Sequence, residues 1–252
     1  MLDSSLFSYR FYADDHVING TDLFVDISGR LLIAADKESG KKYLVRHTYP
    51  HNAANAYVAC WLAEKLGVPA PKAWLLSPNA VFASKYAVAM EFIEGFTGFE
   101  NAALPEELKT ELIGQLAFHT LIASAERMQL RLSGGHIYAY DFPEAFYFDN
   151  DMVFTILLHN KNAGREMMKH KLDAFRRYIG NQSFDIPKLA GNFQLDRDER
   201  KAGMVAAAKK VLDITDNEIR AMADELMEGY PAVIAAYYEE CIRFLQNWMK
   251  RF

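Results

Sequence analysis

The spacing of apolar residues changes character near residue 100 of the chain. Before that point the apolar runs are short and are separated by turn-forming residues, which is typical of β-strands. From residue 103 onward the apolar residues recur mostly at helical intervals, which is typical of helices packed along one face. The pattern therefore predicts a β-rich first part and a mostly helical second part.

The first part is expected to hold short strands around a single helix. The predicted strands cover residues 22–27, 30–35, 42–47, 73–76 and 86–93. A glycine lies in the polar connection between the second and third of these, which predicts a hairpin. The order of strands, helix and strands is typical of an antiparallel sheet with a helix on one face, which is an α+β arrangement.

The single helix of the first part is predicted over residues 52–66. Its apolar residues recur every four positions, at Val58, Leu62 and Leu66. Gly67 suits the left-handed residue that commonly ends a helix. Two prolines follow soon after and prevent the helix from continuing.

The second part is predicted to begin with a buried helix of about five turns. Pro105 suits the first position of that helix, and two adjacent apolar ridges follow it. A glycine pair then predicts a turn before a short strand at residues 137–141. Thr215 and Glu218 have the spacing of a capping box at the start of a later helix. The last helix is predicted over residues 232–249.

The composition limits the class of protein. The chain has 252 residues, of which 51% are apolar, and a formal net charge of −5. Such a chain can form a packed core, and its length suits one large domain or two small lobes. The mild acidity argues against a broad nucleic-acid surface, which needs clustered Lys and Arg.

The sequence also bears on the compartment. No apolar run approaches the roughly 18 residues of a membrane span, and residues 1–15 have no apolar secretory core, so we expect no membrane partner and no secretion. Cys60 and Cys241 are too few for a disulfide framework. We therefore expect reduced thiols in a cytoplasmic protein.

Three stretches carry a family resemblance when they are read in order. The first is the strand at 43–46, and the second is the helix at 55–66 with its Leu-Gly-Val-Pro-Ala-Pro ending. The third is the pair of segments 119–128 and 137–146. Together they resemble the HipA-like branch of the protein-kinase fold, the compact bacterial Ser/Thr kinases that include toxin–antitoxin kinases. The resemblance covers most of the chain.

The resemblance implies an α+β, two-lobed, kinase-like fold. Residues 1–95 would form a small antiparallel-sheet lobe with one helix, and residues 96–252 would form a larger, mostly helical lobe. Kinases hold ATP and Mg²⁺ in the cleft between such lobes, so ATP and Mg²⁺ are the implied cofactors.

The resemblance also assigns candidate site residues. Arg46 falls where the phosphate-binding strand lysine is expected, and its alternative is a surface arginine at a strand end. Glu126 falls at the catalytic aspartate, and its alternative is an ordinary charged residue after a helix. Asp141 matches the aspartate that binds the metal, and its alternative is a turn aspartate.

If the cleft binds a nucleotide, the adenine edge is expected at the backbone of Glu91, Phe92 and Ile93, where the predicted strand 86–93 leaves the first lobe.

Several positions depart from the family pattern. Ala56 stands where a glutamate would orient the phosphate-binding cation, and alanine cannot pair with anything. Ser124 replaces an asparagine just before the catalytic loop, and Met128 replaces the histidine of the loop. Arg131 stands where an asparagine would bind Mg²⁺, and a cation there would repel the metal. No glycine-rich phosphate loop precedes the strand of Arg46.

Three functions are open on this sequence, because a fold does not imply its usual function. The favoured one is a pseudokinase-like module that binds a ligand or a protein partner with little phosphotransfer. The second is a divergent ATP-dependent Ser/Thr kinase, or another phosphoryl or nucleotidyl transferase, that uses Glu126 and Asp141. The third is a non-catalytic interaction protein that works through its helical lobe.

Overall fold

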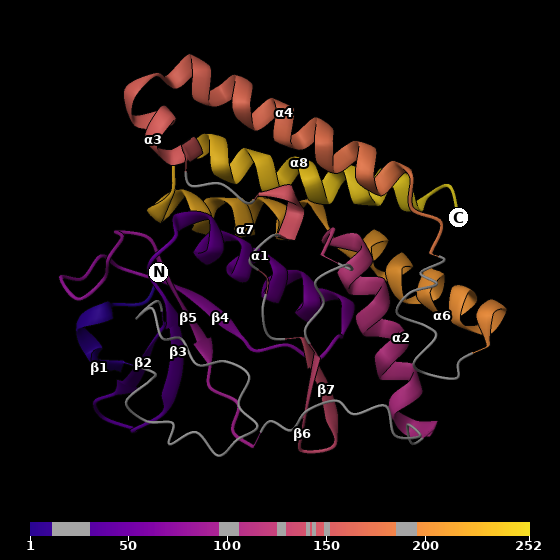
Figure 1. Cartoon of the computed structure of the whole chain (residues 1–252), viewed down its shortest axis with the longest axis horizontal. Helices are drawn as coiled ribbons and strands as arrows, with labels where there is room; N and C mark the ends of the chain where they lie inside the picture. The colour runs from indigo at the N-terminus through magenta and orange to yellow at the C-terminus, as the bar shows by residue number, and fades with distance from the viewer. Residues whose placement is uncertain are drawn as a thin grey trace.

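The computed structural model describes residues 1–11, 31–95, 106–124, 130–139, 142, 145–148, 152–184 and 196–252 (Figure 1). Strands dominate the described chain up to residue 95, and helices dominate it from residue 106. The predicted α+β class is therefore confirmed. The predicted strand at 22–27 lies outside the described residues.

The first part forms a five-stranded sheet with the order β1-β2-β3-β5-β4. Every neighbouring pair is antiparallel, as predicted. The strands are β1 (Phe7–Phe11), β2 (Leu31–Asp36), β3 (Lys42–Arg46), β4 (Ala73–Leu76) and β5 (Ala87–Glu91). The hairpin between β2 and β3 is present, and β4 has the predicted bounds. Strand β1 was not predicted.

One long helix, α1 (Pro50–Leu66), covers one face of this sheet. Because side chains alternate along a strand, Leu44 and Val45 point to opposite faces. Leu44 belongs to the large core that includes α1, whereas Val45 belongs to a smaller core on the other face. The helix ends as predicted, with Gly67 in the left-handed conformation at φ +67°.

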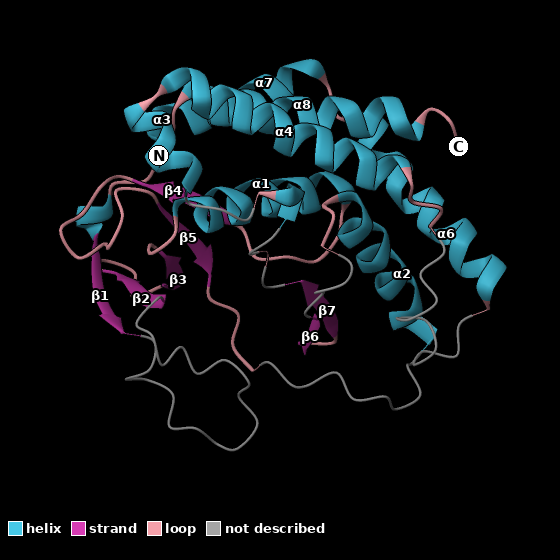
Figure 2. Cartoon of the chain, turned by 45° about the horizontal axis from the view of Figure 1, so that its top comes forward, coloured by secondary structure: helices cyan, strands magenta, loops and turns pink. Residues whose placement is uncertain are grey.

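Helix α1 is buried on nearly all sides, because helices of the second part cover the surface that the sheet leaves open. Figures 1 and 2 both show α1 between the sheet and a layer formed by α4, α7 and α8. These helices span Lys161–Gly180, Asp216–Gly229 and Ala232–Met249. The capping box of Thr215 and Glu218 is present at the start of α7, and α8 has the predicted bounds.

The remaining elements flank this layer. They are η1 (Ser4–Leu6), α2 (Glu106–Leu121), β6 (Leu130–Ser133), β7 (His136–Ala139), η4 (Ala145–Tyr147), α3 (Met152–His159), α6 (Arg197–Lys209) and η5 (Lys210–Asp213). Strands β6 and β7 form a separate antiparallel hairpin, and the predicted strand at 137–141 overlaps β7. Helix α2 packs against α6, where Gly203 lies close to Ile113.

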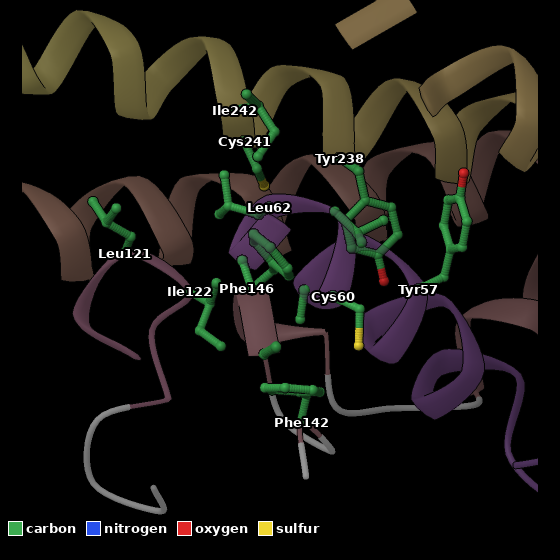
Figure 3. Close-up of a cluster of buried hydrophobic side chains, with 14 of the residues drawn as sticks. Tyr57, Cys60, Leu62, Leu121, Ile122, Phe142, Phe146, Tyr238, Cys241 and Ile242 are labelled. Carbon is green, nitrogen blue, oxygen red and sulfur yellow. The ribbon is translucent and has the colours of Figure 1, made fainter. Parts of the chain in front are cut away.

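The large core joins both parts of the chain. Figure 3 shows side chains that meet there, among them Leu62 of α1, Phe146 of η4 and Tyr238 of α8. Such burial of aromatic rings supplies much of the stability of a domain of this size. Among the described helices, none is both long and apolar enough to cross a membrane.

Candidate functional site

Arg46, the last residue of β3, faces helix α1. It shares its sheet face with Leu44, because the two residues are two positions apart along the strand. On α1 the nearby ionisable group is the thiol of Cys60. Burial raises the pKa of that thiol to about 12, and the charge of Arg46 opposes this effect. The thiol therefore stays protonated and neutral at physiological pH.

Helix α1 has no carboxylate in the turns of Ala56 and Cys60. Ala56, one turn before Cys60, is 1% exposed and packs in the large core. Glu64 is the only acidic residue of α1, and its side chain is exposed to solvent. The helix thus presents a methyl group and a neutral thiol here, and Ala56 is the position where the family resemblance expects a glutamate.

The segment that follows β5 is held from two sides. The Glu91 N–H donates to the Lys72 carbonyl at 2.8 Å, and the Phe92 N–H donates to the Lys42 carbonyl at 3.3 Å. Within the part of the chain that the structure describes, the Ile93 N–H has no hydrogen-bond partner. This backbone is consequently ordered and still has a donor that a ligand can use.

The hairpin of β6 and β7 closes against the same segment. The Ser133 hydroxyl donates a hydrogen bond of 2.8 Å to the Glu94 carbonyl. Side chains alternate along β6, so Arg131 shares the face of Ser133, while Leu130 and Leu132 point to the large core. The predicted departure at Arg131 therefore puts a cation on the face of the hairpin that reaches the segment after β5.

The two predicted acidic residues, Glu126 and Asp141, lie outside the described residues. Their roles remain predictions. Phe142, which follows Asp141, is 1% exposed and packs against Phe118 with ring centroids 5.9 Å apart. It also stacks on His119 at 6.3 Å.

His119 is a buried polar residue at the end of α2. Its Nδ1 is 2.7 Å from the hydroxyl oxygen of Ser124, and its Nε2 has no partner among the described residues. Burial lowers the pKa of His119 to about 3, so the ring is neutral at physiological pH. The sequence did not single out this histidine as a site residue, because its altered pKa results from burial in the folded protein.

A pocket that the sequence did not predict lies beside α1. Its volume is about 590 Å³, and it lies between α1, the connection from α1 to β4, strand β7 and Glu225 of α7. None of Arg46, Glu91, Phe92 and Ile93 lines it. Its walls come from segments far apart in the sequence, so no local motif could reveal it.

No metal centre is evident in the described ranges. Those residues contain no group of three or more His, Cys, Asp or Glu side chains that could hold a metal ion. The predicted Mg²⁺ ligand, Asp141, is not among them. The Mg²⁺ site that the family resemblance implies therefore stays a prediction.

The sheet, the covering helix and the hairpin below the segment after β5 together define a protein-kinase-like fold. The chain is similar to the crystal structure of a Helicobacter pylori proinflammatory kinase, CtkA, with a TM-score of 0.50. The match covers 88% of this chain and 91% of that chain at 13% sequence identity, so it shows the fold alone. No protein-family model matches the sequence, and no curated protein matches it.

Proposed function

We propose that this chain is a HipA-like, kinase-fold protein that binds a nucleotide at Arg46 and the segment after β5, with little phosphotransfer. One observation carries the proposal: α1 presents Ala56 and the neutral Cys60 thiol toward Arg46, and its one carboxylate, Glu64, is exposed two turns beyond Ala56. Phosphoryl transfer depends on a cation that is held in place against the phosphates. Arg46 can pair with other groups, but α1 does not orient it with a charge.

The proposed site has groups that suit nucleotide binding. A guanidinium at Arg46 can grip phosphate oxygens with two parallel hydrogen bonds. The Ile93 N–H can donate to an adenine ring, in the segment that Ser133 and Lys42 hold in place. Arg131 on the hairpin would repel Mg²⁺ at the position that the family resemblance assigns to a metal ligand. Binding with weak catalysis fits this set of groups.

A divergent kinase is the second candidate, and one observation favours it. Phe142, next to Asp141, packs on His119, and His119 bonds to Ser124, two residues before Glu126. Phe142 and Ser124, which lie close in sequence to Asp141 and Glu126, therefore both contact His119. An active site built from Glu126 and Asp141 would require these two segments to lie close together. In that case Glu126 would accept the substrate proton and Asp141 would hold Mg²⁺.

The proposed compartment is the cytoplasm. Cys60 and Cys241 are both reduced and buried, which fits a reducing environment.

Nucleotide binding is tested by thermal unfolding of the wild type with ATP and Mg²⁺. A ligand that binds only the folded state adds about 2.7 kcal/mol at a hundred times its Kd, which raises the Tm of a domain of this size by several degrees. Arg46→Met should lose most of that rise. The control is Arg177→Met, because Arg177 is exposed on α4.

The two variants separate the possible results. A rise in the wild type and in Arg177→Met, with little rise in Arg46→Met, supports the proposal. The absence of a rise with any nucleotide, in the presence of either Mg²⁺ or Mn²⁺, contradicts it. A full rise in Arg46→Met also contradicts it.

A further inference from the structure

The pocket of about 590 Å³ beside α1 has the size of a small-molecule site. Its walls are rich in aromatic rings, from Tyr57 and Trp61 of α1, Trp74 of β4 and Tyr138 of β7. Trp61 and Trp74 are only partly buried, so their rings are accessible from the pocket side. Aromatic walls of this kind favour organic ligands over inorganic ions.

Two carboxylates stand among these rings. Glu225 accepts a hydrogen bond of 2.6 Å from the Tyr57 hydroxyl, so it is fixed in orientation without being neutralised. Glu64 is exposed and forms no ion pair within the described ranges. The two carboxylates therefore give this part of the pocket a negative charge.

The cations in the pocket offset this charge only in part. His136 Nδ1 lies 2.6 Å from Oε1 of Glu111. The Glu111 carboxylate therefore balances the positive charge of a protonated His136 ring. Lys72 is exposed at the connection to β4. Apart from His136, the charged residues of the lining are Glu64, Glu225 and Lys72, so its formal balance is negative.

We propose that this pocket binds an organic cation, a guanidinium or ammonium group carried by a small ligand or by a side chain. A cation over an aromatic ring gains about 0.5–2 kcal/mol, and a nearby carboxylate adds to that attraction. A cation already lies near one of these rings from outside the lining: the Lys65 ammonium is 6.0 Å from the Trp61 ring centroid, and Glu218, 2.7 Å away, balances its charge.

The pocket is distinct from the proposed nucleotide site, and the inference does not rest on nucleotide binding. Arg46 and the segment after β5 do not line it. Cys60 does line it, and the same thiol lies within the electrostatic reach of Arg46. A ligand in the pocket would thus touch the helix that also borders that site.

The test is a titration followed by NMR of the tryptophan indole N–H signals. The probe is N-acetyl-arginine methylamide, and N-acetyl-citrulline methylamide is its neutral isostere. Trp61 and Trp74 line the pocket, whereas Trp248 is 2% exposed and packs on Phe184 in the C-terminal helices. We expect saturable shifts of the Trp61 and Trp74 signals with the arginine probe, and no shift of the Trp248 signal.

Variants of the carboxylates identify the cause of binding. Glu64→Gln with Glu225→Gln keeps the shape and removes both charges, and should weaken the arginine probe about fivefold or more. Glu166→Gln, at an exposed position of α4, should leave its affinity unchanged. An unchanged Trp248 signal shows that the variants are folded.

A second titration, with a capped Gly-Arg-Gly peptide, distinguishes a cation on a small ligand from a cation on a partner's side chain. Tighter binding of the peptide than of the arginine probe supports the inference and assigns the cation to a partner's side chain. Equal or weaker binding supports it and assigns a small ligand. Equal shifts with the citrulline probe, no shifts with either arginine ligand, or an unchanged affinity in the double variant would overturn it.

Discussion

The Tyr238 hydroxyl of α8 donates a hydrogen bond of 2.8 Å to Oδ1 of Asn55 on α1. The amide nitrogen of the same Asn55 donates to the Phe148 carbonyl at 2.6 Å. Figure 3 shows Tyr238 reaching from α8 toward α1.

An ion pair adds a third link, because the Lys65 ammonium of α1 lies 2.7 Å from Glu218 of α7. Side-chain bonds to the C-terminal helices therefore hold α1 in the position that brings Ala56 and Cys60 to the sheet.

The buried Asn55–Tyr238 pair predicts a measurable loss of stability. Tyr238→Phe should lower the free energy of unfolding by about 1–2 kcal/mol, because it removes a buried hydrogen bond to the Asn55 oxygen. Asn55→Ala should lower it by about 2–4 kcal/mol, because two buried partners lose their bonds. Urea unfolding of both single variants and of the double variant gives the coupling energy of the pair.

Tyr43→Phe is the matched control, since Tyr43 is half-buried and its hydroxyl has no hydrogen bond within the described ranges. Equal stability of Tyr238→Phe and Tyr43→Phe would show that the Asn55–Tyr238 bond does not hold α1 in place.

Two glycines of α4 should respond in opposite ways to alanine. A Cβ added at Gly164 would lie 2.3 Å from Leu157 Cδ2 and 3.1 Å from Leu157 Cα, so Gly164→Ala should cost about 1–3 kcal/mol. At Gly180 nothing lies within 4 Å of the added atom. Gly180→Ala should be neutral or stabilise the helix by up to about 1 kcal/mol. Thermal unfolding distinguishes them, and a Tm of Gly164→Ala at or above the wild-type value would contradict the close approach of α3 and α4.

His119 should make the fold sensitive to acid. Burial lowers the pKa of His119 in the folded protein to about 3 from an ordinary value of 6.5, so the unfolded chain takes up this proton first. Above about pH 6.5 the ring is neutral in both states and contributes no pH dependence. As the pH falls from about 6.5 toward 3, this one proton should lower the stability by about 1.4 kcal/mol per unit.

Denaturant midpoints at pH 7.5, 6 and 5 test this prediction in the wild type and in His119→Asn. Asparagine keeps a polar group toward Ser124 but cannot take up the proton, so the variant should lose less stability on acidification. His170→Asn, at an exposed position of α4, should follow the wild type. Parallel curves for the wild type and His119→Asn would mean that His119 is not held neutral by burial.

The sequence predicted the elements whose pattern is local. The bounds of β4 and α8 and the capping box at Thr215 agree with the structure, because each depends on a few neighbouring residues. Helix α1 begins two residues before the predicted start, since Pro50 suits a first helical turn. Strand β1 has the alternation of a strand, but an edge strand of five residues is evident only beside its partner β2.

The candidate site could be predicted only in part. Arg46 and the segment from Glu91 to Ile93 are placed by strand positions, which the apolar pattern reveals. The role of His119 depends on burial, and the pocket depends on contacts between α1, β4, β7 and α7, which lie far apart in the chain. Sequence periodicity contains no information on such long-range contacts.

Nucleotide binding without efficient phosphotransfer can be tested by single-turnover phosphotransfer from radiolabelled ATP. We expect a rate at least about a hundredfold below the 1–100 s⁻¹ of ordinary kinases, with little further loss in Glu126→Gln or Asp141→Asn. A rate of about 1 s⁻¹ or more on the protein itself or on a generic substrate, abolished by either substitution, would contradict it and establish a divergent kinase.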